Sequence, residues 1–174
     1  MRTNRVKQLW REGKPAIGGF LSIPSGLSAE AMAHTGLDWL CIDMQHGCID
    51  YSDVVPMLTA ISTTAVTPIV RVPWNEPSMI MKVLDAGAYG VIVPMVSNRA
   101  EAERAVAACR YPPVGIRSNG PNRAVYYSGA DYQKNADSEM LCIAMIETAE
   151  GIAKMEEIIS TPGLDAVYIG PTDL

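Results

Sequence analysis

Six short, nearly continuous apolar runs recur along this chain, and a segment with helical spacing follows almost every one of them. Such runs are typical of parallel strands that are covered on both faces, whereas strands with one face in water alternate apolar and polar residues. We expect strands at residues 17–21, 39–43, 68–72, 90–94, 141–146 and 166–169. This alternation of strand and helix limits the chain to an α/β fold with a parallel sheet.

Five segments between these runs have the spacing of helices, at residues 25–34, 53–61, 77–86, 98–109 and 149–160. Ser25 is a favoured residue for a helix start, and Gly36 is favoured just past a helix end. Asn98, three residues before Glu101, resembles a capping box. Residues 110–139 are rich in Pro, Gly, Asn and Tyr and break the alternation. We predict that they form a long loop and a wall of a functional site.

Two architectures have this alternation, an open doubly wound sheet and a closed barrel. Neither a GxGxxG turn after the first strand nor a Walker A sequence is present, which disfavours a nucleotide-binding open sheet. Polar, reactive residues instead follow strand after strand, as in a (β/α)8 TIM barrel. We therefore predict an α/β barrel, with residues 1–174 as a single domain. Since a full barrel needs eight strands and roughly 250 residues, we expect this one to be incomplete after its sixth strand.

Composition excludes several other classes of protein. The 174 residues are 48% hydrophobic and 19% charged, with a formal net charge of −5, as in a folded protein rather than a disordered one. The acidic balance argues against nucleic acid or an anionic membrane as a partner, and no run approaches the ~20 apolar residues of a membrane span. The polar, basic first residues lack the apolar run of a secretory signal, and the four cysteines have no CxxC spacing. We expect a cytoplasmic protein with reduced thiols.

Two carboxylates, Glu147 and Asp173, each follow an apolar strand and lie one strand–helix–strand unit apart. Neighbouring parallel strands would point both carboxylates into one pocket mouth. Two oxygen ligands with the remaining positions open to water and substrate suit Mg²⁺ or Mn²⁺. Taken singly, each residue is better explained as a helix cap. Together, at matching strand ends, they favour a metal site.

His46 and Arg71 also follow predicted strands. A histidine in this place can act as a general base near neutral pH, with Asp43 orienting it. His34 lies near a helix end, where a cation suits the helix dipole, and we interpret it as structural. Arg71 would bind a carboxylate through two hydrogen bonds or stabilise an oxyanion, unless it pairs with Asp43 instead. The segment IGPTD offers backbone amides for an anion.

The segments IDMQHG, PIVRVPWNEP, KVLDAGAYGVIVPMV, RYPPVGIRSNGPNRA, MIETAEG and YIGPTDL together resemble the HpcH/HpaI aldolase family in order and spacing. These are metal-dependent pyruvate aldolases, and their larger grouping includes the citrate lyase β subunit. The resemblance implies a barrel of the phosphoenolpyruvate/pyruvate-binding type. It implies that His46 is the catalytic base and that Arg71 binds the oxo acid and stabilises the transition state. It further implies that Asp85 raises the basicity of the histidine, that Glu147 and Asp173 bind the metal, and that the backbone of Gly170, Pro171 and Thr172 holds the substrate carboxylate.

The activity that the resemblance implies is cleavage of a 4-hydroxy-2-oxo acid into pyruvate and an aldehyde through a metal-stabilised enolate. Such a substrate is a 2-oxo-3-deoxy acid or a 2,4-dihydroxyhept-2-enedioate-type acid, as in the catabolism of aromatic compounds. The implied cofactor is a divalent ion, Mg²⁺ or Mn²⁺, with Co²⁺ as a further candidate. The implied partners are a small 2-oxo acid, an aldehyde and further copies of the chain in a trimer or hexamer.

Asp85 and Met145 depart from a simple match to this family. Asp85 closes a predicted helix, and barrel helices end on the face opposite the active site, so Asp85 would act on a neighbouring subunit. Met145 stands where many of these aldolases have a glutamine that contacts the substrate, and Gln45 and Ser118 replace the more common Glu and Gly. These changes leave the identity of the substrate open.

Three alternatives remain open at this point. The same site would serve an oxaloacetate decarboxylase or another enolate-transfer enzyme, and an inactive barrel fragment or scaffold would need no site at all. A Schiff-base aldolase is disfavoured, because no lysine falls on a predicted strand.

Overall fold

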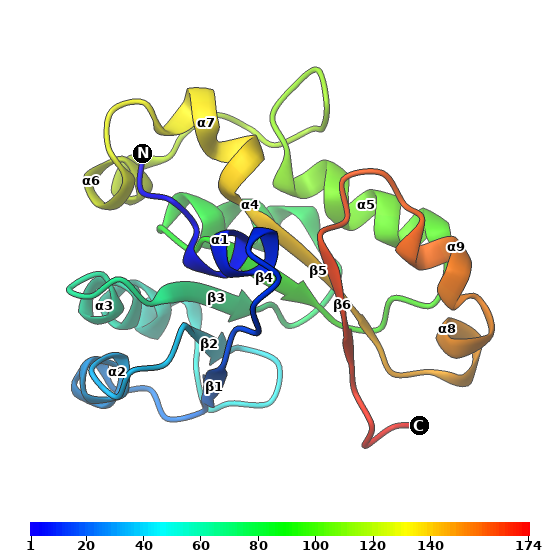
Figure 1. Ribbon diagram of the computed structural model, residues 1–174, viewed down its shortest axis with the longest axis horizontal. Helices are drawn as coiled ribbons and strands as arrows, with labels where there is room; N and C mark the ends of the chain where they lie inside the picture. The colour runs from blue at the N-terminus through cyan, green and yellow to red at the C-terminus, as the bar shows by residue number, and fades with distance from the viewer.

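The computed structural model describes residues 1–174 and contains one sheet of six parallel strands in sequential order (Figure 1). The strands are β1 (Gly18–Leu21), β2 (Trp39–Asp43), β3 (Thr67–Arg71), β4 (Gly90–Val93), β5 (Leu141–Ile146) and β6 (Ala166–Ile169). The helices are α1 (Arg5–Arg11), α2 (Gly26–Ala33), α3 (Tyr51–Ile61), α4 (Pro77–Asp85), α5 (Arg99–Cys109), α6 (Asn122–Ser128), α7 (Tyr132–Glu139), α8 (Ala149–Ala153) and α9 (Met155–Ile159). All six predicted strands are present, within one residue at each end.

The sheet curls into part of a barrel, with α2, α3, α4 and α5 around its outer side (Figure 1). Each strand pairs in parallel with the next one in the chain, so that all the carboxyl ends meet at one edge. The registers place Asp43 beside Arg71 and Ile146 beside Ile169. Residues that follow these strands therefore gather at one mouth, as a barrel requires.

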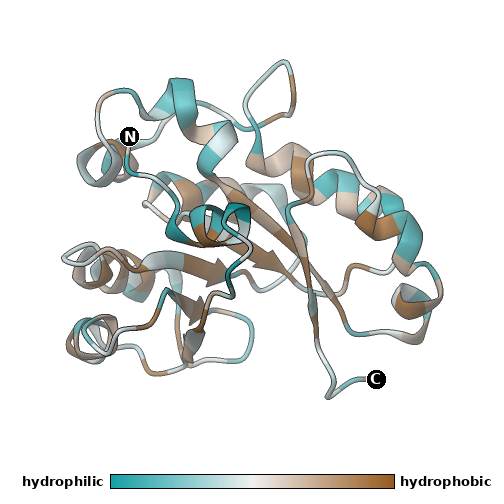
Figure 2. Ribbon diagram, viewed as in Figure 1, coloured by the Kyte–Doolittle hydropathy of each residue, from teal (hydrophilic) through white to brown (hydrophobic).

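Two apolar clusters cover the two faces of the sheet. The larger has 37 buried residues and fills the space between the strands and the outer helices. The smaller lies on the inner face and consists of Val6, Cys41, Ile69, Ile92, Leu141, Ile143 and Met145. Figure 2 shows the strands as the most hydrophobic part of the chain. Burial on both faces explains why the strand sequences are continuous apolar runs rather than alternating ones.

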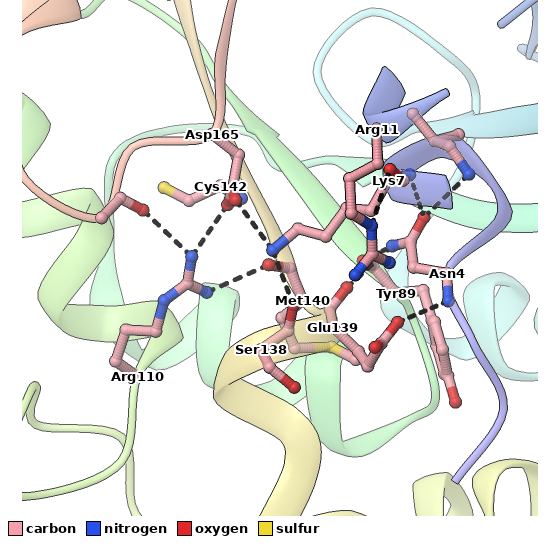
Figure 3. A network of polar contacts seen from close by, with 12 residues as sticks. Asn4, Lys7, Arg11, Tyr89, Arg110, Ser138, Glu139, Met140, Cys142 and Asp165 are labelled. Atoms are coloured by element: carbon pink, nitrogen blue, oxygen red, sulfur yellow. Dashed lines mark hydrogen bonds and ion pairs between the residues drawn. The ribbon is translucent and has the colours of Figure 1, made fainter. Parts of the chain in front are cut away.

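Helix α1 packs against the amino ends of the strands through the polar network of Figure 3. The Asn4 side chain accepts hydrogen bonds from the first amides of α1 and donates to the carbonyls of Tyr89 (3.1 Å) and Glu139 (2.8 Å). Lys7 and Arg110 both pair with Asp165, each at 2.8 Å. These contacts place Val6 in the inner cluster. The sequence did not indicate α1, because a helix of seven residues shows little periodicity.

Two predictions for the connecting segments are wrong. Residues 110–139 contain the helices α6 and α7 and lie near the amino ends of the strands, away from the carboxyl ends where the predicted site residues gather (Figure 1). Within one chain they therefore form no wall of that site. The segment 149–160 is two short helices that break at Lys154, and Ile152 and Ile159 are exposed while Ile158 is buried. The apolar stripe that suggested one long helix does not face the core.

We expect Asp85→Ala to destabilise the fold by about 3 kcal/mol, because it leaves a buried cation without its carboxylate. Arg117 has a fully buried side chain whose Nη2 donates to Asp85 Oδ1 (2.8 Å) and to the Tyr132 hydroxyl (2.9 Å). Arg117→Met should cost less, because the Asp85 carboxylate is partly exposed and can be hydrated. Urea unfolding of both variants measures the difference. An Arg117→Met variant that is less stable than Asp85→Ala would contradict this account.

Candidate active site

A cavity of ≈ 380 Å³ opens at the carboxyl ends of the strands. It brings together every predicted site residue except Asp85, and Tyr168, which was not predicted, lies among them with Met145. Its lining consists of His46, Arg71, Met145, Glu147, Tyr168, Gly170, Pro171, Thr172 and Asp173. A larger hollow of ≈ 500 Å³ on the surface near α1 has no histidine or carboxylate in its lining, so we place the chemistry in the smaller cavity.

Arg71 is held by Asp43 and still reaches the cavity. Its Nε donates to Asp43 Oδ1 (2.8 Å) and its Nη2 donates to Oδ2 (2.6 Å). Its Nη1 points to Met145 Sδ at 3.7 Å, and the guanidinium lies 5.1 Å from the centre of the Phe20 ring. The predicted alternative of an Asp43 pair is confirmed, and it leaves one edge of the guanidinium for a substrate oxygen.

The Asp43–Arg71 pair also sets the charge of both groups. Burial favours the neutral form of Asp43, but hydrogen bonds from Arg71 and from the amides of His46 and Gln45 outweigh it, so that the pKa of Asp43 is lowered. The hydrogen bond to Asp43 raises the pKa of Arg71, because it outweighs burial, which acts in the opposite direction. Both groups therefore stay ionised at neutral pH.

His46 lies at the exposed rim of the cavity, in the turn after β2. Asp43 Oδ1 accepts hydrogen bonds from the amides of Gln45 (3.1 Å) and His46 (3.3 Å). A Cβ at Gly47 would lie 2.3 Å from the Asp43 carbonyl, so the turn requires glycine there. Asp43 thus positions His46 through the backbone of the turn; the structure shows no hydrogen bond from Asp43 to the imidazole.

Glu147 is buried at the end of β5, and its position depends on a residue far away in the sequence. Its Oε1 accepts a hydrogen bond from the amide of Met95 (2.8 Å). Met95 has a φ of 56°, a left-handed conformation that is uncommon for a methionine. The alternative in which Glu147 caps the next helix is wrong, because Thr148 is the cap and accepts from the amide of Gly151 (2.9 Å).

The turn after β6 has fewer free amides than its sequence suggested. The amide of Gly170 donates to the Ile146 carbonyl (3.0 Å), and Pro171 has no N–H. Of the three residues predicted to hold a carboxylate through their amides, only Thr172 can do so. The amide of Asp173 is a second donor beside it, since neither makes a backbone hydrogen bond within the chain. Gly170 instead leaves space beside Glu147, because a Cβ at this position would come within 3.2 Å of Glu147 Oε2.

Glu147 and Asp173 fit a hard divalent cation. Both carboxylates line the same cavity, and the missing side chain at Gly170 leaves space beside Glu147 Oε2. No group of three or more His, Cys, Asp or Glu side chains in the structure is arranged to hold a metal ion. A site with two protein carboxylates leaves its other positions to water and substrate, which is the usual arrangement for Mg²⁺.

Asp85 is not brought to this cavity within one chain. It ends α4, on the side of the amino ends of the strands, and pairs there with Arg117. A catalytic role for Asp85 therefore stays a prediction that requires a second copy of the chain.

Sequence reasoning missed Met95 and Tyr168. Tyr168 could have been found, because it lies two residues before Gly170 and so faces the same side of the strand. No local signal marks Met95, which is 52 residues from Glu147.

A curled parallel β/α sheet with two carboxylates, an arginine and a histidine at its carboxyl edge has the arrangement of an enzyme of the α/β-barrel class. None of its helices has the length and apolar character needed to cross a membrane. The model of the HpcH/HpaI aldolase/citrate lyase family matches residues 17–174. This chain belongs to that family.

Individual relatives agree with this assignment. The chain is 49% identical to a hydroxypyruvate/pyruvate aldolase of Rhizorhabdus wittichii, and the match includes 98% of this chain and 68% of that protein. It is 40% identical to a 4-hydroxy-2-oxo-heptane-1,7-dioate aldolase of Salmonella dublin, with 98% of this chain matching 66% of that protein. A crystal structure of a family member from Burkholderia cenocepacia superposes with a TM-score of 0.91 at 38% identity, over 99% of this chain and 70% of that one. The chain spans about two thirds of the length of these relatives.

Proposed function

We propose that this chain carries the active site of a divalent-metal-dependent class II aldolase, which cleaves a 4-hydroxy-2-oxo acid into pyruvate and an aldehyde. The single observation that carries the proposal is the cavity that Arg71, His46 and the carboxylates of Glu147 and Asp173 share. The aldolase relatives support the reaction class. We also propose that the fold of the whole enzyme is the (β/α)8 barrel of the pyruvate-binding type, of which these six strands are a part.

The oxo-acid end of the substrate would bind between Arg71 and the turn after β6. Glu147 and Asp173 would hold a divalent ion, Mg²⁺ or Mn²⁺, which would supply Lewis acidity toward the oxo acid. The free edge of the Arg71 guanidinium binds the keto oxygen, and the amides of Thr172 and Asp173 bind the carboxylate. Because Asp43 fixes Arg71 before the substrate arrives, the cation is already in place where negative charge develops.

His46 moves the proton in this scheme. As the C3–C4 bond breaks, His46 accepts the proton of the 4-hydroxyl group, and the C4 carbon leaves as the aldehyde. The electron pair of the broken bond becomes the enolate, whose oxygen Arg71 stabilises. Return of a proton to C3 completes pyruvate. An exposed position at the rim leaves the imidazole free to contact the 4-hydroxyl group of a bound substrate.

We expect chelation with EDTA to abolish pyruvate release from 4-hydroxy-2-oxo acids, and Mn²⁺ or Mg²⁺ to restore it. Glu147→Gln keeps the size of the side chain but removes its charge, so it should weaken metal binding at least tenfold. Glu150→Gln is the matched control, because Glu150 is exposed and pairs only with Lys154. Metal affinity is measured by titration of each apoprotein with Mn²⁺.

Two results would contradict this function. Cleavage that persists in EDTA would exclude the metal-dependent reaction, and normal Mn²⁺ affinity in Glu147→Gln would remove this residue from the metal site. If the metal-loaded protein binds pyruvate but cleaves no aldol, the decarboxylation of oxaloacetate is the next reaction to assay on the same cavity.

A further inference from the structure

Met145 and Tyr168 form a layer of the cavity directly below Glu147 and Gly170. Met145 of β5 and Tyr168 of β6 are paired in the register of the two strands. Met145 lies two residues before Glu147, and Tyr168 lies two residues before Gly170, and all four residues line the cavity. Since side chains alternate along a strand, both point to the same inner side as the residues above them. They therefore form the floor on which a bound molecule would rest.

The Tyr168 ring is held firmly while its hydroxyl group has no partner. The ring packs on Phe20, with centroids 5.8 Å apart and an interplanar angle of 54°. Phe20 comes from β1 and also contacts Trp39 (6.0 Å) and the Arg71 guanidinium (5.1 Å). Tyr168 is partly exposed to the cavity, and its hydroxyl group makes no hydrogen bond within the protein. An aromatic ring fixed in this way presents its hydroxyl at little entropic cost.

The neighbouring floor residue offers no hydrogen-bond donor. Met145 has only a thioether, a weak acceptor, and it already lies 3.7 Å from Arg71 Nη1. The other neutral side-chain donors of the cavity lie above the floor: Thr172 belongs to the turn after β6, and the neutral imidazole of His46 lies at the rim. An oxygen atom of a ligand that reaches the floor beside Arg71 can therefore find a neutral side-chain donor only at Tyr168.

We propose that Tyr168 is a specificity-determining residue whose hydroxyl donates a hydrogen bond to an oxygen of the 2-oxo acid, in the layer where Met145 supplies no donor. The bond selects ligands that place a carboxylate or carbonyl oxygen on the floor of the cavity. This inference rests on the proposed function, because it takes a 2-oxo acid as the ligand.

The test compares pyruvate binding to the wild type and to Tyr168→Phe, by calorimetric titration with saturating Mn²⁺. Loss of one neutral hydrogen bond should raise the Kd about five- to tenfold. The variant removes a single oxygen and keeps the ring on Phe20, so its melting temperature should equal that of the wild type. Addition of Met145→Gln places an amide donor on the paired strand at the same level. The double variant Met145→Gln/Tyr168→Phe should therefore return to within about threefold of the wild-type Kd.

The outcomes separate this inference from the proposed function. An unchanged Kd in Tyr168→Phe would overturn the assignment of Tyr168, whatever the wild type catalyses. A double variant that binds as weakly as Tyr168→Phe would overturn the position of the hydrogen bond beside Met145. A wild type that binds no pyruvate in the presence of Mn²⁺ would instead overturn the proposed function.

Discussion

Replacement of His46 by alanine is expected to lower the rate of aldol cleavage by about 10²–10⁴-fold, the range for loss of a general base. Metal affinity should remain near that of the wild type, because the side chain is at the rim of the cavity and the carboxylates proposed to hold the metal follow β5 and β6. Stability should also change little, because His46 is exposed and its backbone, not its ring, contacts Asp43. Steady-state kinetics together with Mn²⁺ titration measure both effects.

His34→Ala is the matched control for this prediction. His34 is the other histidine of the chain and lies exposed at the end of α2, outside the cavity. Its removal should leave cleavage unchanged. Weak metal binding in His46→Ala would make this histidine a ligand rather than a base, and full activity would exclude it from the reaction.

Arg71→Lys should lower kcat/KM by about 10²–10³-fold, even though it conserves the charge. The guanidinium uses two nitrogens to bind Asp43 and a third to face the cavity, and an ammonium group cannot hold that geometry. The same change leaves the buried Asp43 carboxylate with at most one of its two side-chain hydrogen bonds. We therefore expect a measurable loss of stability in urea as well.

The control for Arg71→Lys is the same substitution at Arg99, an exposed residue that pairs with Glu103 on one side of α5. That variant should behave as the wild type in both assays. Near-normal cleavage by Arg71→Lys would show that only the positive charge matters and that the two hydrogen bonds between the guanidinium and Asp43 have no part in catalysis.

The strands and their order along the chain were predictable because each is an apolar run that is buried on both faces. The runs at Trp39–Asp43 and Leu141–Ile146 end where the observed strands end, since a charged residue occupies the last or next position. Segments with mixed exposure were not predictable in this way. The helices α6 and α7 have polar sequences, and they form because tertiary contacts such as Arg117 with Tyr132 bury their apolar residues.

The residues of the cavity were predictable for the same reason, because the end of a parallel strand points to one edge of the sheet. The residues that contact these side chains from other parts of the chain were not predictable. The amide that binds Glu147 belongs to Met95, and the ring that supports Tyr168 belongs to Phe20, on the opposite edge strand of the sheet. No spacing along the chain relates these pairs, because the pairing of β4 with β5 brings Met95 to Glu147 and the curl of the sheet brings Phe20 to Tyr168.

The sequence by itself determined the parallel α/β class, the six strands, the family and most of the residues at the mouth of the barrel. Those properties depend on hydrophobic periodicity and on which residues follow each strand, and both are local. Only the tertiary structure decided that Asp43 holds Arg71, that the Gly170 amide is used within the sheet and that Tyr168 lies beside Met145. Each of these depends on the register between strands and on hydrogen bonds that compete for the same groups, which are set only when the chain has folded.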